Sequence, residues 1–159
     1  MEIKNIGILG CGQMGSGIAE VAAKSGYEVM VCEVNDKALS SGLGKVQKSL
    51  AKAVERGKLA ADVMEATLAR ITGTLNVADM ADCDIVIEAV FEDLPTKQRV
   101  FGELDQVVKP EAILATNTSS ISIAAIAAAT KRGDKVIGMH FFNPVPVMQL
   151  VEYVPSILT

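Results

Sequence analysis

A glycine-rich turn near the N-terminus constrains the fold of this chain more than any other feature. Residues 10–15 read GCGQMG, follow a short apolar run over 3–9, and lead into apolar side chains at helical spacing over 14–25. Glycines at this spacing allow a tight turn, a close approach of the backbone to a pyrophosphate, and close packing of helix on strand. With a second strand expected over 28–33, they predict a dinucleotide site at the helix N-terminus. The residues expected to bind the dinucleotide are Gly10, Gly12, Gln13, Met14 and Gly15.

Alternating strand and helix patterns along the rest of the chain predict the fold class. Apolar and β-branched runs predict strands at 72–75, 84–90, 112–116, 135–141 and 147–154, and helical spacing predicts helices at 36–59, 61–71, 95–108 and 121–130. Strands that alternate with helices pair in parallel through right-handed crossovers. We therefore expect residues 1–159 to form one α/β domain, with a doubly wound, mostly parallel sheet of the Rossmann type. Ligands of such sheets bind beyond the carboxyl ends of the strands.

Glu33, at the end of the second predicted strand, favours NAD as the cofactor. It follows Gly15 by 18 residues, where a carboxylate accepts hydrogen bonds from the hydroxyls of the adenosine ribose. A carboxylate also repels the additional phosphate of NADP, and no arginine or lysine stands at position 34 or 35 to bind that phosphate. FAD, which shares the glycine pattern, and a purely structural turn are the alternatives.

Charge, aromatic content and cysteines exclude several other classes of protein. The 159 residues carry a formal net charge of −4, with four Phe, two Tyr and no Trp. Nucleic-acid binding needs a basic surface and stacking platforms, so we expect no such partner. No apolar run approaches the roughly 20 residues of a membrane span. Cys11, Cys32 and Cys83 are odd in number and form no CxxC pair, which predicts small buried thiols, no disulfide framework, no metal site and a reducing cytoplasm.

His140 is the candidate acid–base group. It is the only histidine and ends a predicted strand at the edge where ligands bind. An imidazole takes and returns protons near neutral pH, which the oxidation of an alcohol by NAD requires. Glu152 follows after a turn that contains Pro144 and Pro146, and a returning strand would bring its carboxylate beside the ring, where it would orient and stabilise the imidazolium. The alternative is a structural histidine bonded to the backbone, with an exposed glutamate.

The polar loop over 117–120, NTSS, follows the end of another predicted strand. The hydroxyl of Ser119 could bind the oxygen that alternates between alcohol and ketone. The alternative is an N-cap for the next helix, a role that suits Ser120 better.

Three motifs resemble those of 3-hydroxyacyl-CoA dehydrogenases. Residues 140–152 contain HFFNPVPVM and then LVE, residues 117–120 read NTSS, and residues 88–94 read EAVFEDL with Lys97 close behind. The resemblance covers nearly the whole chain. It implies NAD-dependent oxidation of (S)-3-hydroxyacyl-CoA to 3-oxoacyl-CoA, within fatty-acid or butanoate metabolism. The resemblance also implies that His140 is the general base of this reaction, that Glu152 orients that base, and that Ser119 contacts the substrate.

The resemblance also assigns ligand-binding roles that the residue pattern alone does not. Glu92 and Lys97 match positions near the cofactor ribose, and the alternative for them is a solvated ion pair at a helix start. Asn117 belongs to the cofactor site, and Asn143 lies close to both nicotinamide and substrate. 

A projecting helix pair, expected over 36–71, is implied to help hold coenzyme A. Ser49, Lys52 and Arg56 lie on nearly one face of the first helix, where cationic groups suit the phosphates of coenzyme A. A basic helix face that is simply solvated is the alternative.

Members of this family continue into a second, helical domain that closes over the acyl chain and contributes to a homodimer. We expect that domain to be missing from residues 1–159, so that NAD binding survives while turnover is weak or absent. The rival functions are an NAD-binding module without catalysis, another NAD enzyme of this architecture, such as a 6-phosphogluconate or 3-hydroxyisobutyrate dehydrogenase, and a purely structural role. The HFFNP motif and Glu152 argue against the second rival.

Overall fold

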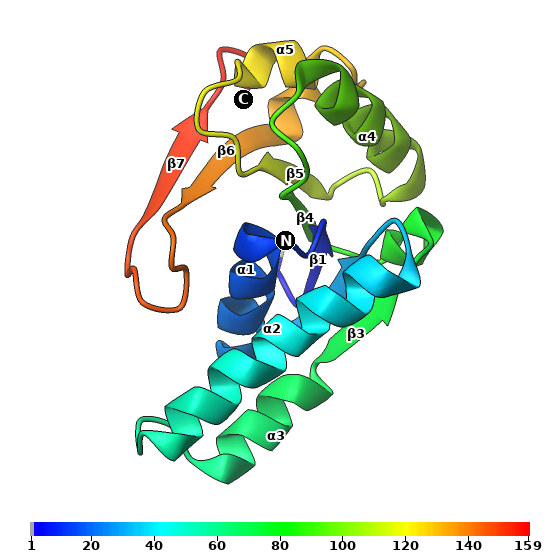
Figure 1. Ribbon diagram of the computed structural model, residues 1–159. Helices are drawn as coiled ribbons and strands as arrows, with labels where there is room; N and C mark the ends of the chain where they lie inside the picture. The colour runs from blue at the N-terminus through cyan, green and yellow to red at the C-terminus, as the bar shows by residue number, and fades with distance from the viewer. Residues whose placement is uncertain (1) are drawn as a thin grey trace.

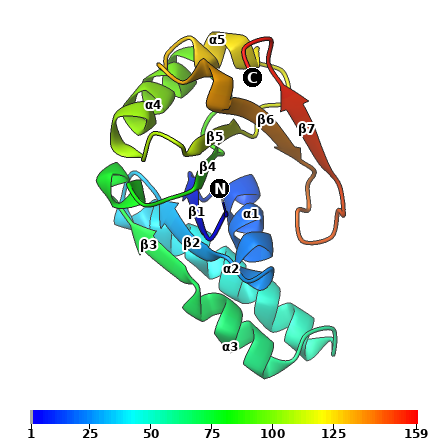
Figure 2. The same ribbon diagram turned by 180° about the vertical axis from the view of Figure 1, so that it is seen from behind.

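A seven-stranded sheet in the order β3-β2-β1-β4-β5-β6-β7 organises the chain, in a computed structural model that describes residues 2–159 (Figures 1 and 2). Each neighbouring pair is parallel except β6 and β7, which are antiparallel. This confirms the predicted Rossmann sheet. The strands are β1 (Asn5–Leu9), β2 (Glu28–Cys32), β3 (Ile71–Thr74), β4 (Ile85–Glu88), β5 (Ile113–Thr116), β6 (Val136–Phe141) and β7 (Val151–Pro155). The α-helices are α1 (Gln13–Lys24), α2 (Asp36–Glu55), α3 (Ala61–Ala69), α4 (Leu94–Val107) and α5 (Ile123–Ala127).

Helices cover both faces of the sheet. Successive side chains of a strand point to opposite sides, so the apolar central strands present side chains on both faces that the helices bury. Ile85 and Ile87 of β4 pack into one core with α1, while Val86 packs into a second core. That second core also holds Phe101 of α4 and Ile126 of α5, both fully buried. Burial on both faces explains why the central strands are continuous apolar runs.

The predicted helix pair α2–α3 projects beyond the sheet, as both views show (Figures 1 and 2). The Asn35 side chain caps α2 by accepting a hydrogen bond from the Ala38 amide at 2.8 Å. Near its start α2 crosses the glycine-rich turn closely. A β-carbon at Gly42 would lie only 2.4 Å from the carbonyl oxygen of Cys11, so contact with the turn requires glycine there.

Several predicted boundaries are wrong, for local reasons. The last strand begins at Val151 rather than Val147, because the segment after Pro144 forms turns in which the amides of Val147 and Met148 bond the Pro144 carbonyl at 3.0 Å. Helix α5 is shorter than predicted, and α2 ends at Glu55, just before Gly57 adopts a φ of 68°. The sequence did not predict two 3₁₀ helices, Val77–Met80 between β3 and β4 and Gly133–Lys135 between α5 and β6.

An ion pair between the buried Asp84 and the partly exposed Lys109 lies at the edge of the sheet opposite the ligand-binding edge. One carboxylate oxygen of Asp84 accepts hydrogen bonds from the amides of Lys4 and Asn5 at 2.7 and 2.8 Å, and the other contacts Nζ of Lys109 at 2.5 Å. The hydrogen bond from Lys109 and those from the two amides lower the pKa of Asp84 from 3.8 to about 2. The ionised carboxylate therefore stabilises the fold.

Substituting Asp84 with alanine should lower the free energy of unfolding by about 2 kcal/mol at pH 7, because two amides lose their acceptor. Because the pKa is lowered on folding, this contribution is present above about pH 4 and disappears as the pH falls toward 2. Urea unfolding at several pH values would measure it. A stability gap between the two proteins that is as large at pH 2 as at pH 7 would contradict this account.

Candidate functional site

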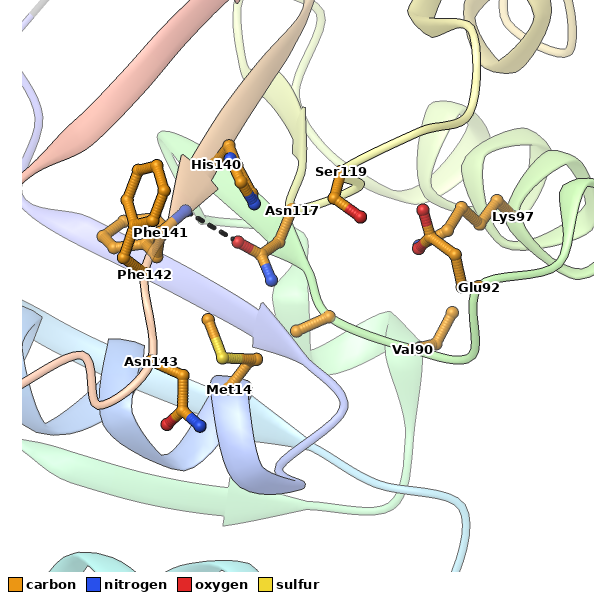
Figure 3. Close-up of a pocket in the computed structure, with 11 residues that line it drawn as sticks. Met14, Val90, Glu92, Lys97, Asn117, Ser119, His140, Phe141, Phe142 and Asn143 are labelled. Carbon is orange, nitrogen blue, oxygen red and sulfur yellow. Dashed lines mark hydrogen bonds and ion pairs between the residues drawn. The ribbon is translucent and has the colours of Figure 1, made fainter.

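The predicted ligand-binding edge holds a cavity where the carboxyl ends of β1, β4, β5 and β6 meet, here called the strand-end cavity (Figure 3). Most of its lining residues are ones that the sequence singled out. Helix α1 contributes its start, the segments after β4 and β5 contribute loops, and β6 contributes its last residues. The lining residues are Met14, Ala89, Val90, Glu92, Lys97, Asn117, Ser119, His140, Phe141, Phe142 and Asn143.

His140 and Glu152 are directly opposite one another in the antiparallel pairing of β6 with β7. Residues opposite each other in such a pair project from the same face. Nδ1 of His140 lies 2.8 Å from Oε2 of Glu152, so the two side chains are in contact as the returning strand predicted. The His140 ring also lies 4.7 Å from the ring of Phe142, tilted by 54°. Both contacts orient the imidazole toward the cavity.

The loop after β5 is tied to β6 and to the loop after β4. Oδ1 of Asn117 accepts a hydrogen bond from the Phe141 amide at 2.9 Å, which joins the ends of β5 and β6. The hydroxyls of Thr118 and Ser120 donate to Oε1 of Glu92. Ser119, between them, faces the strand-end cavity across from His140 (Figure 3).

The predicted capping role of Ser120 is wrong. The N-cap of α5 is Ser122, whose side chain accepts a hydrogen bond from the Ala125 amide at 3.3 Å. Because α5 starts two residues later than predicted, Ser120 belongs to the loop, where it contacts Glu92. No Ser119 hydroxyl bond is formed within residues 2–159, which leaves that hydroxyl for the cavity.

Glu92 and Lys97 form an ion pair that is solvated only on the side of Glu92, which is 41% exposed. Only 1% of the Lys97 side chain is exposed, and its Nζ lies 3.3 Å from Glu92 and 2.7 Å from Glu88. Burial opposes ionisation of Glu92, but the hydrogen bond from Thr118 and the charge of Lys97 outweigh burial and lower its pKa. Glu88, the first residue of the EAVFEDL motif, was assigned no role from the sequence, because it falls inside an apolar strand pattern.

The glycine-rich turn has the form that a dinucleotide requires. Gly10 has a φ of 90°, where other residues are strained. A β-carbon at Gly12 would meet no protein atom within 4 Å, so the space above the turn is open. Helix α1 has neither a side-chain cap nor an acidic residue in its first turn, unlike α2, α4 and α5, which are capped by side chains. Its N–H groups and positive dipole end thus suit the pyrophosphate of NAD.

Glu33 has a contact that the sequence did not predict. Its Oε1 accepts a hydrogen bond from the Cys11 amide at 2.5 Å, and Oε2 accepts one from the Val34 amide at 3.1 Å. The carboxylate therefore also supports the glycine-rich turn. It lines a second pocket beside Gly10, Val34 and Phe91, next to the turn, which is the position expected for the adenosine end of a dinucleotide.

The cysteine that lies within this turn, Cys11, is buried, as are Cys32 and Cys83, which agrees with their predicted role. Burial, together with the charges of nearby carboxylates, raises the pKa of each thiol to about 11. Because the thiolate is the reactive form, we expect all three thiols to react with iodoacetamide at pH 8 many times more slowly in the folded protein than in guanidinium chloride. Mass spectrometry of alkylated peptides would measure the rates. Rapid alkylation of Cys11 in the folded protein would refute this prediction.

A groove between α1, α2 and the turn after β6 holds two of the three residues predicted to bind coenzyme A. Ser49 and Lys52 line it beside Glu20, Lys45 and Lys48. Arg56 lies in an adjoining pocket that shares Ser49 and Lys52. Burial raises the pKa of Glu20. The groove meets the strand-end cavity at Asn143, whose Oδ1 accepts a 3.3 Å hydrogen bond from Gln13.

Among residues 2–159, no cluster of His, Cys, Asp and Glu side chains has the arrangement of a metal site. In the same residues, no helix is long and apolar enough to cross a membrane.

Comparison with known proteins identifies the family. A family model described as the NAD-binding domain of 3-hydroxyacyl-CoA dehydrogenase matches residues 5–159. This chain belongs to that family. The family match confirms the resemblance seen in the sequence, and it supports NAD as the cofactor.

Individual relatives include proteins named 3-hydroxybutyryl-CoA dehydrogenase. A probable 3-hydroxybutyryl-CoA dehydrogenase of Deinococcus radiodurans is 52% identical over 93% of this chain and 53% of its own length. A 3-hydroxybutyryl-CoA dehydrogenase of Mycobacterium tuberculosis is 48% identical over 99% of this chain and 55% of its own length. The crystal structure of M. tuberculosis FadB2 superposes with a TM-score of 0.98, covering 100% of this chain and 56% of that one. The chain thus spans about half the length of these relatives.

Proposed function

We propose that this chain provides the cofactor site and the acid–base pair of an enzyme that oxidises (S)-3-hydroxyacyl-CoA to 3-oxoacyl-CoA with NAD. The observation that carries the proposal is the 2.8 Å contact of His140 with Glu152, on a cavity that also holds Ser119. An imidazole paired with a carboxylate next to a free hydroxyl suits the removal of a proton from an alcohol. The names of the relatives, several of them 3-hydroxybutyryl-CoA dehydrogenases, agree with this substrate class.

His140 acts as general base in the oxidation and as general acid in the reverse reaction. Its Nδ1 faces Glu152, so Nε2 is the nitrogen that accepts the hydroxyl proton of the substrate. The carboxylate of Glu152 stabilises the imidazolium that forms. Ser119 binds the substrate oxygen as that oxygen changes from hydroxyl to carbonyl. NAD, when bound, supplies the hydride acceptor.

Each part of the bound cofactor is assigned to residues of a different structural element. The uncapped start of α1 and the turn before it hold the pyrophosphate. The residues of this site are Gly10, Gly12, Gln13, Met14 and Gly15. Glu33 binds the adenosine ribose, while Glu92 and Lys97 approach the other ribose. Asn117 and Asn143 lie on the cavity beside the nicotinamide.

The substrate's coenzyme A lies in the groove between α1 and α2. Ser49 and Lys52 line that groove, Arg56 lines its extension, and their charges suit phosphates. Asn143, shared by groove and cavity, contacts the substrate between its two ends.

A second, helical domain, which the resemblance to the family implies, would complete the enzyme by covering the acyl chain and contributing to a homodimer. Glu152 is 55% exposed here, and water exclusion strengthens such charge interactions. The expected cytoplasmic location is part of the same proposal. Because the acid–base pair is this open, an NAD-binding module without catalysis is the second candidate function.

Mixing the 159-residue protein with NADH and acetoacetyl-CoA and following the loss of NADH absorbance would decide between the two candidates. Turnover that disappears in His140→Gln would support the enzyme, and NADH binding without turnover in either protein would support the module. If NADH fluorescence shows no binding at all, both candidates are wrong.

A further inference from the structure

Glu88, at the carboxyl end of β4, is a fully buried carboxylate with donors on every side. Its Oε1 accepts hydrogen bonds from Nζ of Lys97 at 2.7 Å and from the Val90 amide at 2.6 Å. Its Oε2 accepts one from the Thr116 hydroxyl at 2.8 Å. An ammonium group, an amide and a hydroxyl together solvate an ionised carboxylate well. Glu88 is 0% exposed, so solvent does not screen its charge.

Glu88, Lys97 and Glu92 form a chain of charges that ends on the strand-end cavity, here called the acidic triad. Nζ of Lys97 lies between the two carboxylates, 2.7 Å from Glu88 and 3.3 Å from Glu92. Two negative charges against one positive charge leave a net charge of −1. Figure 3 shows Glu92 beside Lys97 at one side of the cavity, and both residues line it. The third charged or titratable lining residue is His140.

We infer that the acidic triad strengthens the binding of the oxidised cofactor NAD⁺ relative to that of NADH, with Glu88 as the positioning residue that supplies the excess negative charge. The inference rests on the proposed function, because the nicotinamide must lie in the strand-end cavity to exchange hydride with a substrate whose oxygen contacts His140. The nicotinamide ring carries a positive charge in NAD⁺ and none in NADH. The remainder of the dinucleotide is the same in both forms, so a charge beside the ring acts on their difference.

Glu88 also keeps Lys97 in place without neutralising the cavity. Paired with Glu92 alone, Lys97 would form a pair of zero net charge, and the cavity would not distinguish the two redox forms by charge. A unit charge at a separation of roughly 10 Å in the protein interior changes the ratio of the two dissociation constants about tenfold. Tighter binding of the oxidised form by that factor lowers the two-electron reduction potential of the bound cofactor by roughly 30 mV, which favours hydride transfer from NADH to a 3-oxoacyl substrate.

The test is the ratio of dissociation constants for NAD⁺ and NADH in Glu88→Gln. The amide preserves the shape and still accepts from Lys97 and Val90, but removes one negative charge. NADH binding is measured by fluorescence, and NAD⁺ binding by calorimetry or by displacement of NADH. We expect NAD⁺ binding to weaken about tenfold more than NADH binding. Glu92→Gln replaces a 41% exposed side chain and should shift the ratio of the two dissociation constants in the same direction. If Glu88→Gln does not fold, the Glu92→Gln variant tests whether the charge of the acidic triad sets this ratio.

Asp84→Asn is the matched control. Asp84 is also a buried carboxylate paired with a lysine, Lys109, but it lies at the opposite end of β4. The control should lose stability and leave the NAD⁺ to NADH ratio unchanged. The inference is wrong if Glu88→Gln weakens both forms equally, or if the control shifts the ratio as much. If the unmodified chain binds neither NAD⁺ nor NADH, the proposed function itself is wrong. That outcome differs from an unchanged ratio of dissociation constants, which contradicts only the inference about the acidic triad.

Discussion

Alanine at position 15 is expected to abolish NADH binding and to lower the free energy of unfolding by about 3 kcal/mol or more. A β-carbon there would lie 1.9 Å from the carbonyl oxygen of Gly10 and 2.8 Å from its carbonyl carbon. Both are backbone atoms of the turn between β1 and α1, so they cannot swing aside as a side chain can. Relief of the clash requires α1 to move away from the strand, and with it the N–H groups proposed to bind the pyrophosphate.

Two other glycines separate stability from binding in this experiment. Gly12→Ala adds a β-carbon that meets no protein atom within 4 Å, so the protein should fold normally and yet lose NADH, because the methyl group occupies the space of the phosphates. Gly44→Ala, at an exposed position of α2 with nothing within 4 Å, should leave binding unchanged and stabilise slightly. Urea unfolding and NADH fluorescence would be measured for all three. Unimpaired NADH binding by Gly15→Ala would show that the turn does not carry the cofactor.

Replacing Glu152 with glutamine is expected to lower the rate of acetoacetyl-CoA reduction by about a hundredfold or more while NADH affinity stays the same. The carboxylate contacts Nδ1 of His140 at 2.8 Å but does not line the strand-end cavity. Its loss removes the group that selects the imidazole tautomer and stabilises the imidazolium, and leaves the cofactor contacts intact. The separation of rate from affinity distinguishes this role from a general loss of structure.

The ring of His140 reports on the pair directly. It is the only histidine, so its nitrogen resonances are assigned without ambiguity, and their shifts reveal which nitrogen carries the proton. Glu152→Gln should redistribute the proton between Nδ1 and Nε2, whereas Glu28→Gln, an exposed acid at the start of β2, should not. Identical shifts and identical rates in Glu152→Gln and the unmodified chain would remove Glu152 from the mechanism.

Local patterns predicted the sheet and the acid–base pair because both depend on residues near one another in the sequence. The turn over 10–15 and the alternation of apolar runs define the parallel strands, and 12 residues with two prolines separate His140 from Glu152. Glu88 lies within the EAVFEDL motif but was given no role, because the motif pairs Lys97 with Glu92 and the Thr116 hydroxyl that also binds Glu88 comes from β5, 28 residues away. A buried carboxylate inside an apolar run looks like an ordinary strand end until the tertiary structure supplies its donors.

The helix cap shows the same limit on a smaller scale. Ser119, Ser120 and Ser122 all precede α5, and each could accept from an amide of its first turn. Thr118 decided the outcome, because its hydroxyl contacts Glu92 of another loop and also accepts from the Ile121 amide at 3.0 Å. This contact holds residues 118–121 outside the helix, so Ser122 becomes the cap. Helix-capping propensity alone does not predict the hydrogen bond from Thr118 to Glu92, which lies 26 positions away in the sequence.

The edge position of β7 means that cofactor affinity and proton transfer can fail independently. Within residues 2–159, β7 pairs with β6 alone and all five of its residues are exposed, while the turn between β1 and α1 is fixed by the centre of the sheet. Amide protons of β7 should therefore exchange with solvent long before those of β1 and β4. Partial denaturation would release Glu152 from His140 while the dinucleotide turn persists, giving a protein that still holds NAD but has lost the partner of its base.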